Sequence, residues 1–137
     1  EHSPHYEYHK FDPADPKSHR RSVYRFIVRS QPDPFMTSLD CADSSQSTPK
    51  RDETLTALQA LSLLNNKFTL EMSNRFSARL KKDSKKLETQ IHRAHQLTTG
   101  RPPTAKEMAA LEKFARQHGL PNLCRVLFNL SEFTYLD

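Results

Sequence analysis

Apolar side chains are spread very unevenly along this chain of 137 residues, and this constrains its fold more than any other feature. Residues 1–19 contain almost no aliphatic side chain, whereas residues 54–136 hold nearly all of the leucine, isoleucine and methionine. Because burial of apolar surface is the main driving force for folding, a core can form mainly in the C-terminal two-thirds. We therefore divide the chain into an irregular lead-in (1–19), an extended arm with a long loop (20–53) and a helical domain (54–137).

The N-terminal third shows no clear helical or strand pattern. The lead-in is rich in proline, histidine and acids, and no period of 2 or 3.6 is present. The next segment, residues 20–30, is ambiguous. Val23, Phe26 and Ile27 fit a short helix face, and the β-branched and aromatic content fits a strand equally well. Residues 31–53 contain three prolines and a serine-rich stretch, and we expect this long loop to lie against a surface outside the segment.

From Thr54 onward, capping signals and a helical period predict the first two helices. Thr56 and Gln59 have the spacing of a capping box, in which the hydroxyl and the amide satisfy backbone N–H groups at a helix start. The apolar side of this helix consists of Ala57, Leu58, Leu61 and Leu64. Asn65 and Asn66 suit a left-handed helix end. A second helix is expected over residues 69–81, and its apolar stripe consists of Phe68, Met72, Phe76 and Leu80.

Stop signals delimit three further helices. The third is expected over residues 84–98 and ends at Gly100 before two prolines; its apolar face consists of Leu87, Ile91, Ala94 and Leu97. The fourth begins with a Thr104–Glu107 capping box and ends at Gly119; its apolar residues are Met108, Leu111, Phe114 and Ala115. Pro121 suits the first turn of a fifth helix that ends near Asn129; its apolar residues are Leu123, Cys124, Leu127 and Phe128.

These signals predict a mainly α fold, a small bundle of about five helices with an extended, irregular N-terminal arm. Each helix would bury its apolar stripe, which stabilises the fold by about 25 cal/mol per Å² of apolar area. We expect Leu64→Ala or Phe76→Ala to cost about 2–5 kcal/mol where the side chain is buried in this core.

No pattern in the chain nominates a catalytic or metal site. Gly100 and Gly119 are the only glycines, so a glycine-rich phosphate loop is excluded, and neither GxSxG nor HExxH occurs. His2, His5 and His9 of the lead-in could bind a metal only weakly, because no motif spacing places a carboxylate or thiolate to complete the ligand set. His92 and His95 share a helix face, which we interpret as solvated. We therefore expect no cofactor and no metal in this segment, and whether it belongs to an enzyme stays open.

Two acids of the long loop and three arginines are the candidates for structural ion pairs or for anion binding. They are Arg20, Arg21, Arg51, Asp40 and Asp43. Two acids are too few for a calcium loop, and no histidine is placed by the sequence to activate Cys41 between them. We interpret these acids as partners of the arginines that pin the long loop, since an arginine fork suits a fixed carboxylate.

The net charge of +5 and the pI of about 9.4 restrict the partner classes only weakly. The positive residues are interspersed with acids, as on an ordinary soluble surface. No apolar run approaches the roughly 18 residues of a transmembrane helix. Cys41 and Cys124 match no zinc or haem motif, and whether they form a disulfide stays open. The chain has neither a starting methionine nor a visible signal peptide, and we expect it to be a piece of a longer protein.

Five segments, in order, resemble a known family. They are RRSVYRF, FMTSLDCAD, KRDETLTALQALSLLNNKF, TGRPPTAKEMAALEKF and LCRVLFNLSEFTYLD. This order resembles the planctomycete cytochrome-associated C-terminal domain of unknown function, DUF1553, over about residues 20–137. Leu39 stands where the family usually has Phe before Asp, and Ala42 stands where Pro is frequent. The long loop therefore departs from the family pattern in detail.

The resemblance implies the C-terminal part of a large exported protein, periplasmic or otherwise outside the cytoplasm. In such proteins the segment follows another domain of unknown function and often a cytochrome c-like domain. Haem c would then belong to the parent protein and not to this segment. The family has no defined catalytic residues, so the resemblance assigns none here.

Three functional hypotheses follow. The first is a structural and interaction module that docks on upstream domains of the parent chain, beside a haem domain where one is present. The second is part of an enzyme or binding protein for an anionic, sulfated polysaccharide, gripped by Arg20, Arg21 and Arg51. The third, nucleic-acid binding, rests on charge alone, and export counts against it.

Overall fold

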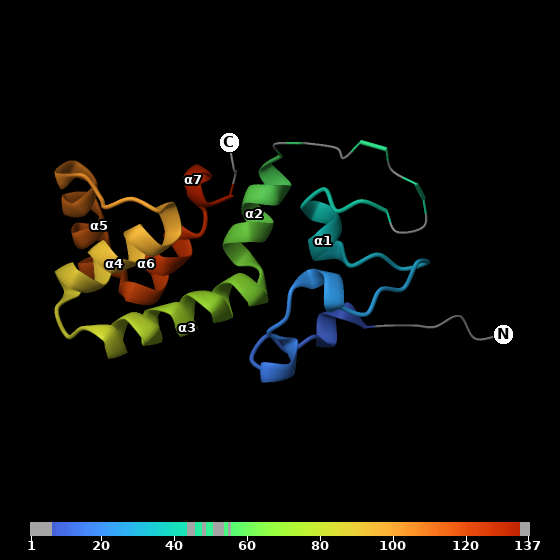
Figure 1. Cartoon of the computed structure of the whole chain (residues 1–137), viewed down its shortest axis with the longest axis horizontal. Helices are drawn as coiled ribbons and strands as arrows, with labels where there is room; N and C mark the ends of the chain where they lie inside the picture. The colour runs from blue at the N-terminus through green and yellow to red at the C-terminus, as the bar shows by residue number, and fades with distance from the viewer. Residues whose placement is uncertain (1–6, 44–45, 48, 51–53, 55, 135–137) are drawn as a thin grey trace. The chain divides into compact units, whose positions relative to one another are not determined.

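The computed structural model describes residues 7–43, 46–47, 49–50, 54 and 56–134, and in this part of the chain the regular structure is helical. The prediction of a mainly α fold is confirmed, with five helices of eight residues or more, two shorter ones and no strand among the described residues (Figure 1). Contacts divide the chain into two compact units, Glu1–Ser62 and Leu63–Asp137. We call them the N-terminal unit and the helical unit.

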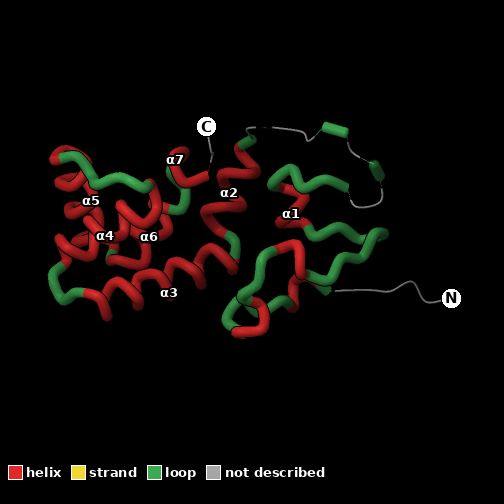
Figure 2. Tube along the Cα trace, viewed as in Figure 1, coloured by secondary structure: helices red, strands yellow, loops and turns green. Residues whose placement is uncertain are grey.

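The N-terminal unit is built from short turns and one short helix (Figure 2). Its 3-10 turns are Tyr8–Lys10, Pro16–Ser18 and Ser22–Tyr24, and α1 spans Pro34–Ser38. Residues 20–30 are neither a helix nor a strand, since the turn Ser22–Tyr24 is followed only by an isolated bridge between Val28 and Gln31. Asp15 and Asp33 each start a helical turn, because their carboxylates accept a backbone N–H two residues on and a proline follows.

The helix α2, Ala57–Asn65, starts at the predicted capping box. The backbone N–H of Gln59 donates to Thr56 Oγ1 at 3.2 Å, and the N–H of Thr56 donates to Gln59 Oε1 at 3.0 Å. The expected apolar side is nonetheless exposed, with Leu58 at 71% and Leu61 at 56%, whereas Gln59 is buried. Capping is a local effect and was predictable, but the buried face of this helix is set by polar contacts of Gln59 described below.

The helical unit contains α3 (Lys67–Asp83), α4 (Leu87–Thr99), α5 (Ala105–His118), α6 (Leu120–Leu127) and α7 (Ser131–Thr134). Gly100 ends α4 with a left-handed φ of 77°, as expected, and Gly119 separates α5 from α6 at φ 84°. The prediction of a left-handed end at Asn65 and Asn66 is wrong. Asn66 has φ −64° and caps α3, because its side chain accepts the N–H of Phe68 at 2.8 Å.

The core of the helical unit lies around α6, which contacts α3, α4 and α5 (Figure 1). Its buried residues are Leu80, Ile91, Ala94, Ala115, Leu120, Leu123, Cys124 and Leu127. Phe76, Met108, Leu111 and Phe114 pack against it, as the apolar stripes predicted. Three predicted core positions of this unit are wrong, because Leu64, Phe68 and Leu97 are 36%, 38% and 39% exposed. On α4 the buried face is rotated toward His95, which is only 2% exposed, so its expected solvated face is also wrong.

Candidate functional site

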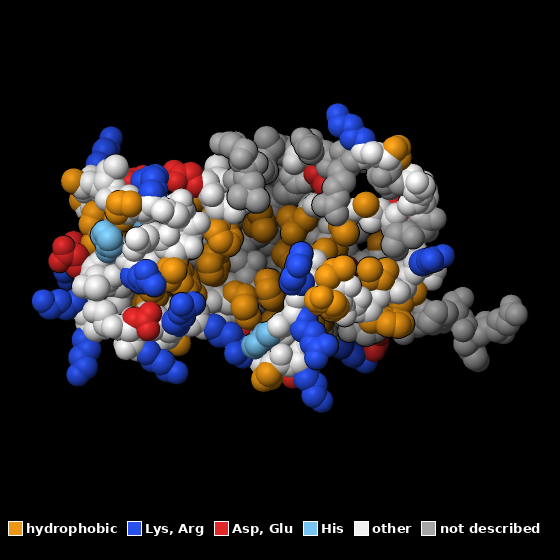
Figure 3. Space-filling view, in the orientation of Figure 1, with side chains coloured by type: hydrophobic (Ala, Val, Ile, Leu, Met, Phe, Trp, Pro, Cys, Tyr) orange, Lys and Arg blue, Asp and Glu red, His pale blue; other side chains and the backbone are white. Residues whose placement is uncertain are grey.

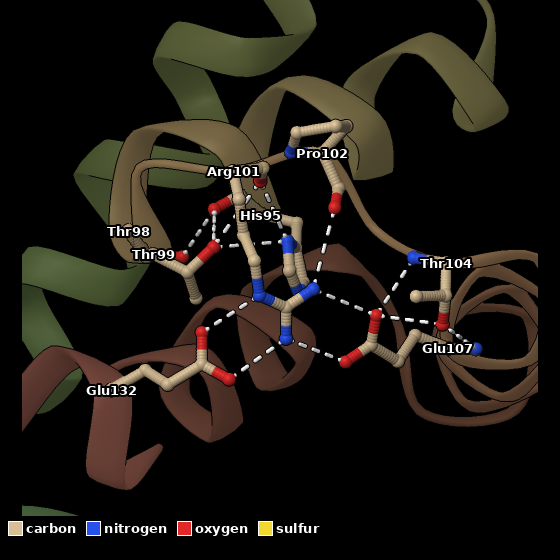
Figure 4. Close-up of polar contacts among 8 residues, drawn as sticks. All are labelled: His95, Thr98, Thr99, Arg101, Pro102, Thr104, Glu107 and Glu132. Atoms are coloured by element: carbon tan, nitrogen blue, oxygen red, sulfur yellow. Dashed lines mark hydrogen bonds and ion pairs between the residues drawn. The ribbon is translucent and has the colours of Figure 1, made fainter.

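A dense polar network surrounds Arg101, in the loop between α4 and α5 (Figure 4). Its Nη1 and Nη2 donate to the carboxylate of Glu107 at 3.0 and 2.8 Å, and its Nε and Nη2 donate to Glu132 at 3.0 and 2.7 Å. Nη1 also donates to the carbonyl of Pro102 at 3.3 Å. A guanidinium has five N–H donors, and all five are used here. We call Arg101, Glu107 and Glu132 the arginine clamp.

The carboxylate of Glu107 has a second role, since it completes the predicted capping box of α5 (Figure 4). The backbone N–H and the hydroxyl of Thr104 donate to Glu107 Oε2 at 2.7 and 2.8 Å, and the N–H of Glu107 donates back to Thr104 Oγ1 at 3.3 Å. One carboxylate therefore starts α5 and binds Arg101. The clamp thus joins the α4–α5 loop, the first turn of α5 and the helix α7.

The clamp keeps all three of its groups charged. Hydrogen bonds from Arg101 hold the pKa of Glu107 far below its usual range, with the backbone N–H of Thr104 as the second cause. The same guanidinium lowers the pKa of Glu132, and the two carboxylates raise the pKa of Arg101. A general acid or base must exchange a proton near the working pH. Neither carboxylate meets this requirement, so the clamp is suited to holding elements together.

The buried side chain of His95 is hydrogen-bonded to the same loop. Its Nδ1 lies 3.1 Å from the carbonyl oxygen of Arg101 and 3.1 Å from Thr99 Oγ1. A carbonyl oxygen can only accept, so the bond to Arg101 places the hydrogen on Nδ1. The hydroxyl of Thr99 is 2.9 Å from the carbonyl of His95, to which it donates. This buried histidine is a structural anchor of the α4 end.

The clamp makes the helical unit sensitive to acid. Because the pKa of Glu132 is lowered on folding, its contribution to stability is complete above the unfolded pKa of about 4.5 and disappears as the pH falls through the folded pKa. We expect Glu132→Gln to lower the unfolding midpoint at pH 7, and the difference from the unmodified chain to shrink below pH 4.5. Urea unfolding monitored by circular dichroism at low salt, repeated at several pH values, measures this difference in midpoint.

Glu112→Gln is the matched control for this prediction. Among the described residues, Glu112 pairs only with Arg116, one turn further along the exposed surface of α5, and such pairs contribute little to stability. If Glu132→Gln lowers the urea unfolding midpoint no more than Glu112→Gln does, the clamp does not stabilise the helical unit.

A second polar cluster, in the N-terminal unit, joins Asp40 of the long loop to Thr54 and Gln59. Asp40 Oδ2 accepts the N–H of Thr54 at 2.7 Å and the side-chain amide of Gln59 at 2.9 Å. The hydroxyl of Thr54 lies 2.9 Å from both carboxylate oxygens. These bonds, led by the backbone N–H of Thr54, lower the pKa of Asp40. Asp40 also has a left-handed φ of 55°, a conformation that aspartate tolerates better than most residues.

The candidate anion-binding arginines are not gathered into one site among the described residues. Arg20 lines a pocket of about 130 Å³ together with Lys17, Tyr24 and Arg25. Arg21 is exposed at the start of the Ser22–Tyr24 turn and does not line that pocket. Arg51 lies outside the described residues, and Asp43 is exposed within the long loop. Anion binding by Arg20, Arg21 and Arg51 therefore stays a prediction.

Arg25 is a site residue that sequence reasoning missed. Its Nη1 lies 3.0 Å from Asp33 Oδ2, and its guanidinium lies 4.3 Å from the ring centre of Phe11. Both partners of the ion pair are mostly buried. Asp33 thus caps α1 and fixes Arg25 at once. The available signal was the Asp33–Pro34 helix start, which predicts a fixed carboxylate but does not identify its cation.

The described residues contain no group of three or more His, Cys, Asp or Glu side chains that could hold a metal ion. Of the three histidines weighed as weak metal ligands, His2 and His5 lie outside the described residues, and His9 is exposed, 4.0 Å from the carboxylate of Glu7. Cys41 and Cys124 are both free thiols. None of the helices that the structure describes is long and apolar enough to cross a membrane.

One comparison with known proteins gives a match. The family model described as PSD1, a protein of unknown function (DUF1553), matches residues 2–115, which is more than half of the chain. The matched region contains the Asp40 cluster, Arg101 and Glu107, and it ends before α6 and α7. No curated protein and no solved structure matches the chain.

Proposed function

We propose that this chain, which belongs to the DUF1553 family of proteins of unknown function, is a structural and interaction module that docks on other domains of a larger exported protein. The family match at residues 2–115 confirms the family and contains the first four signature segments, whereas the fifth, LCRVLFNLSEFTYLD, lies beyond it. The family description gives no activity. The proposal therefore depends on what the residues of those segments do in the fold.

Three charged residues of the signature segments, Asp40, Arg101 and Glu107, are engaged in structural contacts. All five donors of Arg101 are used within the chain, and Glu107 accepts from both Arg101 and Thr104. Asp40 is held by Thr54 and Gln59. A residue that binds a substrate needs donors or acceptors that remain available. These engagements support a structural role for the signature residues.

The observation that carries the proposal is a run of exposed apolar side chains in the first signature segment. Val23 is 68% exposed, Tyr24 71%, Phe26 62% and Ile27 56%. We call these four residues the apolar row. Single exposed apolar side chains are ordinary, but four within five consecutive residues are the mark of a surface that another molecule covers. Side chains of this kind reach the surface beside lysine and arginine in the space-filling view (Figure 3).

The charges around the apolar row specify the partner's chemistry. Arg20, Arg21 and Arg29 flank the row and are exposed. An interface typically has an apolar centre and a polar rim, and opposite charges across the rim steer association. The occupant that fits is another domain of the same parent protein, with an apolar docking face and an acidic rim. Export of the parent, and a c-type haem domain within it, belong to the same proposal.

We expect the apolar row to be covered in the full-length parent. Hydrogen–deuterium exchange at residues 20–29 should be slower in the parent than in the isolated chain. The double substitution Val23→Ser and Ile27→Ser should remove this protection, because each side chain loses about 1.5–3 kcal/mol of apolar burial on docking. Since both side chains are exposed in this chain, its own folding should be unaffected.

Leu97→Ser supplies the control for this experiment, because Leu97 is a partly exposed leucine of α4 in the helical unit. Equal exchange at residues 20–29 in the parent and in the isolated chain would contradict docking through the row. The haem part of the proposal has its own test. A sharp c-type band in the dithionite-reduced spectrum of the parent supports it, and a featureless visible spectrum removes it.

Binding of an anionic, sulfated polysaccharide is the second candidate function. Its support is the pocket in which Arg20 lies beside Lys17 and Arg25. Such binding would weaken steeply with added salt, since it depends on screened charge. Binding of a carboxylate peptide or of a sulfated sugar at this pocket distinguishes the two candidates.

A further inference from the structure

We infer that the pocket beside the apolar row receives the carboxylate of an acidic side chain from the docking partner. This inference rests on the proposed docking function and names the residue chemistry by which the partner is anchored. The pocket has a volume of about 130 Å³ and is formed within the N-terminal unit. Its lining combines aromatic side chains, Phe11, Tyr24 and Phe26, with Ser18 and three cations, Lys17, Arg20 and Arg25.

Two cations of this pocket have no carboxylate partner among the described residues. None of the ion pairs in the described part of the chain involves Lys17 or Arg20. The neighbouring acids, Asp12 and Asp15, each accept a backbone N–H of their own segment. The pocket therefore has positive charge that the described part of the chain does not neutralise, and an anion would gain two charge-assisted hydrogen bonds there.

The wall of the pocket already binds one carboxylate, that of Asp33. Arg25 holds it at 3.0 Å while its guanidinium lies over the ring of Phe11 at 4.3 Å. This contact holds the side chain of Arg25, which lines the pocket. Asp33 itself does not line the pocket, so its carboxylate does not occupy that space. Lys17 and Arg20 could likewise donate charge-assisted hydrogen bonds to a carboxylate of the docking partner.

The size of the pocket favours one side chain over a polymer. Sites for small organic ligands commonly enclose about 300–1,000 Å³. A volume of about 130 Å³ is below this range and suits a single residue. Moreover, Tyr24 belongs both to the apolar row and to the pocket lining, and so does Phe26. One partner surface would therefore cover the row and insert an acidic side chain at the same time.

The test uses the isolated 137-residue chain and defined probes observed by NMR. The first probe is a capped peptide Phe-Glu-Phe, the second is its Phe-Gln-Phe counterpart, and the third is a sulfated heparin tetrasaccharide. We expect the Glu peptide to shift the amide signals of Lys17, Arg20 and Tyr24, and the Gln peptide to bind about tenfold more weakly, because it lacks the charge.

The variant with Lys17→Ala and Arg20→Ala should weaken binding of the Glu peptide by about tenfold or more. Lys81→Ala with Lys82→Ala removes the same charge from the end of α3 and should leave binding unchanged. Equal binding of the Glu and Gln peptides would overturn the inference. Binding of the tetrasaccharide alone would also overturn it and would favour the polysaccharide candidate.

Peptide binding tests the acidic anchor, and hydrogen–deuterium exchange in the parent tests docking, so the two can fail separately. If neither peptide binds but residues 20–29 are still protected in the parent, the acidic anchor is wrong and the docking function stands. If protection in the parent is absent as well, both fail.

Discussion

Leu123→Ala is expected to lower the free energy of unfolding of the helical unit by about 2–5 kcal/mol. The side chain is fully buried in α6, the helix that contacts α3, α4 and α5. Removing it takes apolar contacts from several helices at once and leaves a cavity that rigid helices cannot close fully. Urea unfolding followed by circular dichroism, in which this unit supplies most of the helical signal, measures the change.

Leu97→Ala is the matched control, because the same atoms are removed from a side chain that is 39% exposed in α4. Its cost should be clearly smaller than the Leu123→Ala cost, and the same holds for Leu64→Ala at 36% exposure. Equal losses for Leu123→Ala and Leu97→Ala would contradict a core centred on α6.

Gly119→Ala is expected to cost about 1–3 kcal/mol through the backbone alone. Gly119 joins α5 to α6 with φ 84° and ψ 159°, a region that only glycine adopts readily. An added Cβ would meet Pro121 Cδ at 3.7 Å, an ordinary contact, so crowding does not contribute. The expected loss is therefore a measure of backbone strain, and thermal unfolding should show a lower midpoint.

Gly100→Asn separates this strain from the general cost of losing a glycine. Gly100 ends α4 in the left-handed region at φ 77° and ψ −8°, which asparagine tolerates, and a Cβ added there would have no heavy atom within 4 Å beyond its chain neighbours. Its cost should be clearly smaller than that of Gly119→Ala. A Gly119→Ala variant as stable as the unmodified chain would show that the α5–α6 junction relaxes freely.

The features that were predictable from the sequence are those set by neighbours along the chain. The Thr104–Glu107 capping box, the stop at Gly100 and the start of α6 beside Pro121 each depend on residues within one turn. Local hydrogen bonds and allowed dihedral angles decide them, and they do not change with the packing of the rest of the fold. The helix bounds therefore agreed to within about one turn.

Buried faces were harder to predict, because polar contacts between distant segments compete with the apolar pattern. In α2 the pattern favoured burial of Leu58 and Leu61, but Gln59 is the buried residue because its amide binds Asp40 and Thr54. In α4 the bond from His95 to the carbonyl of Arg101 places a histidine inside. Periodicity indicates that one face of a helix is buried. It does not show whether a hydrogen-bonded polar side chain or a leucine occupies that face.

The arginine clamp could not be assembled from the sequence. Arg101 and Glu132 lie 31 positions apart, and no local rule links them. Asp40 was expected to pair with arginine and is bound by Thr54 and Gln59, which are 14 and 19 positions away. Three of the signature segments contain these residues, namely Asp40, Arg101, Glu107 and Glu132, but other polar residues stand beside them in the sequence. Only the folded backbone shows which of them meet.

The two free thiols make the chain its own reporter of local opening. Cys41 is exposed in the N-terminal unit, whereas Cys124 is fully buried in the core, and burial raises the pKa of the Cys124 thiol to about 12. Only a thiolate reacts readily with alkylating reagents. A reagent would thus modify Cys41 at once and Cys124 only during transient unfolding of the helical unit. The ratio of the two labelling rates, read by mass spectrometry, would time that unfolding without any introduced probe.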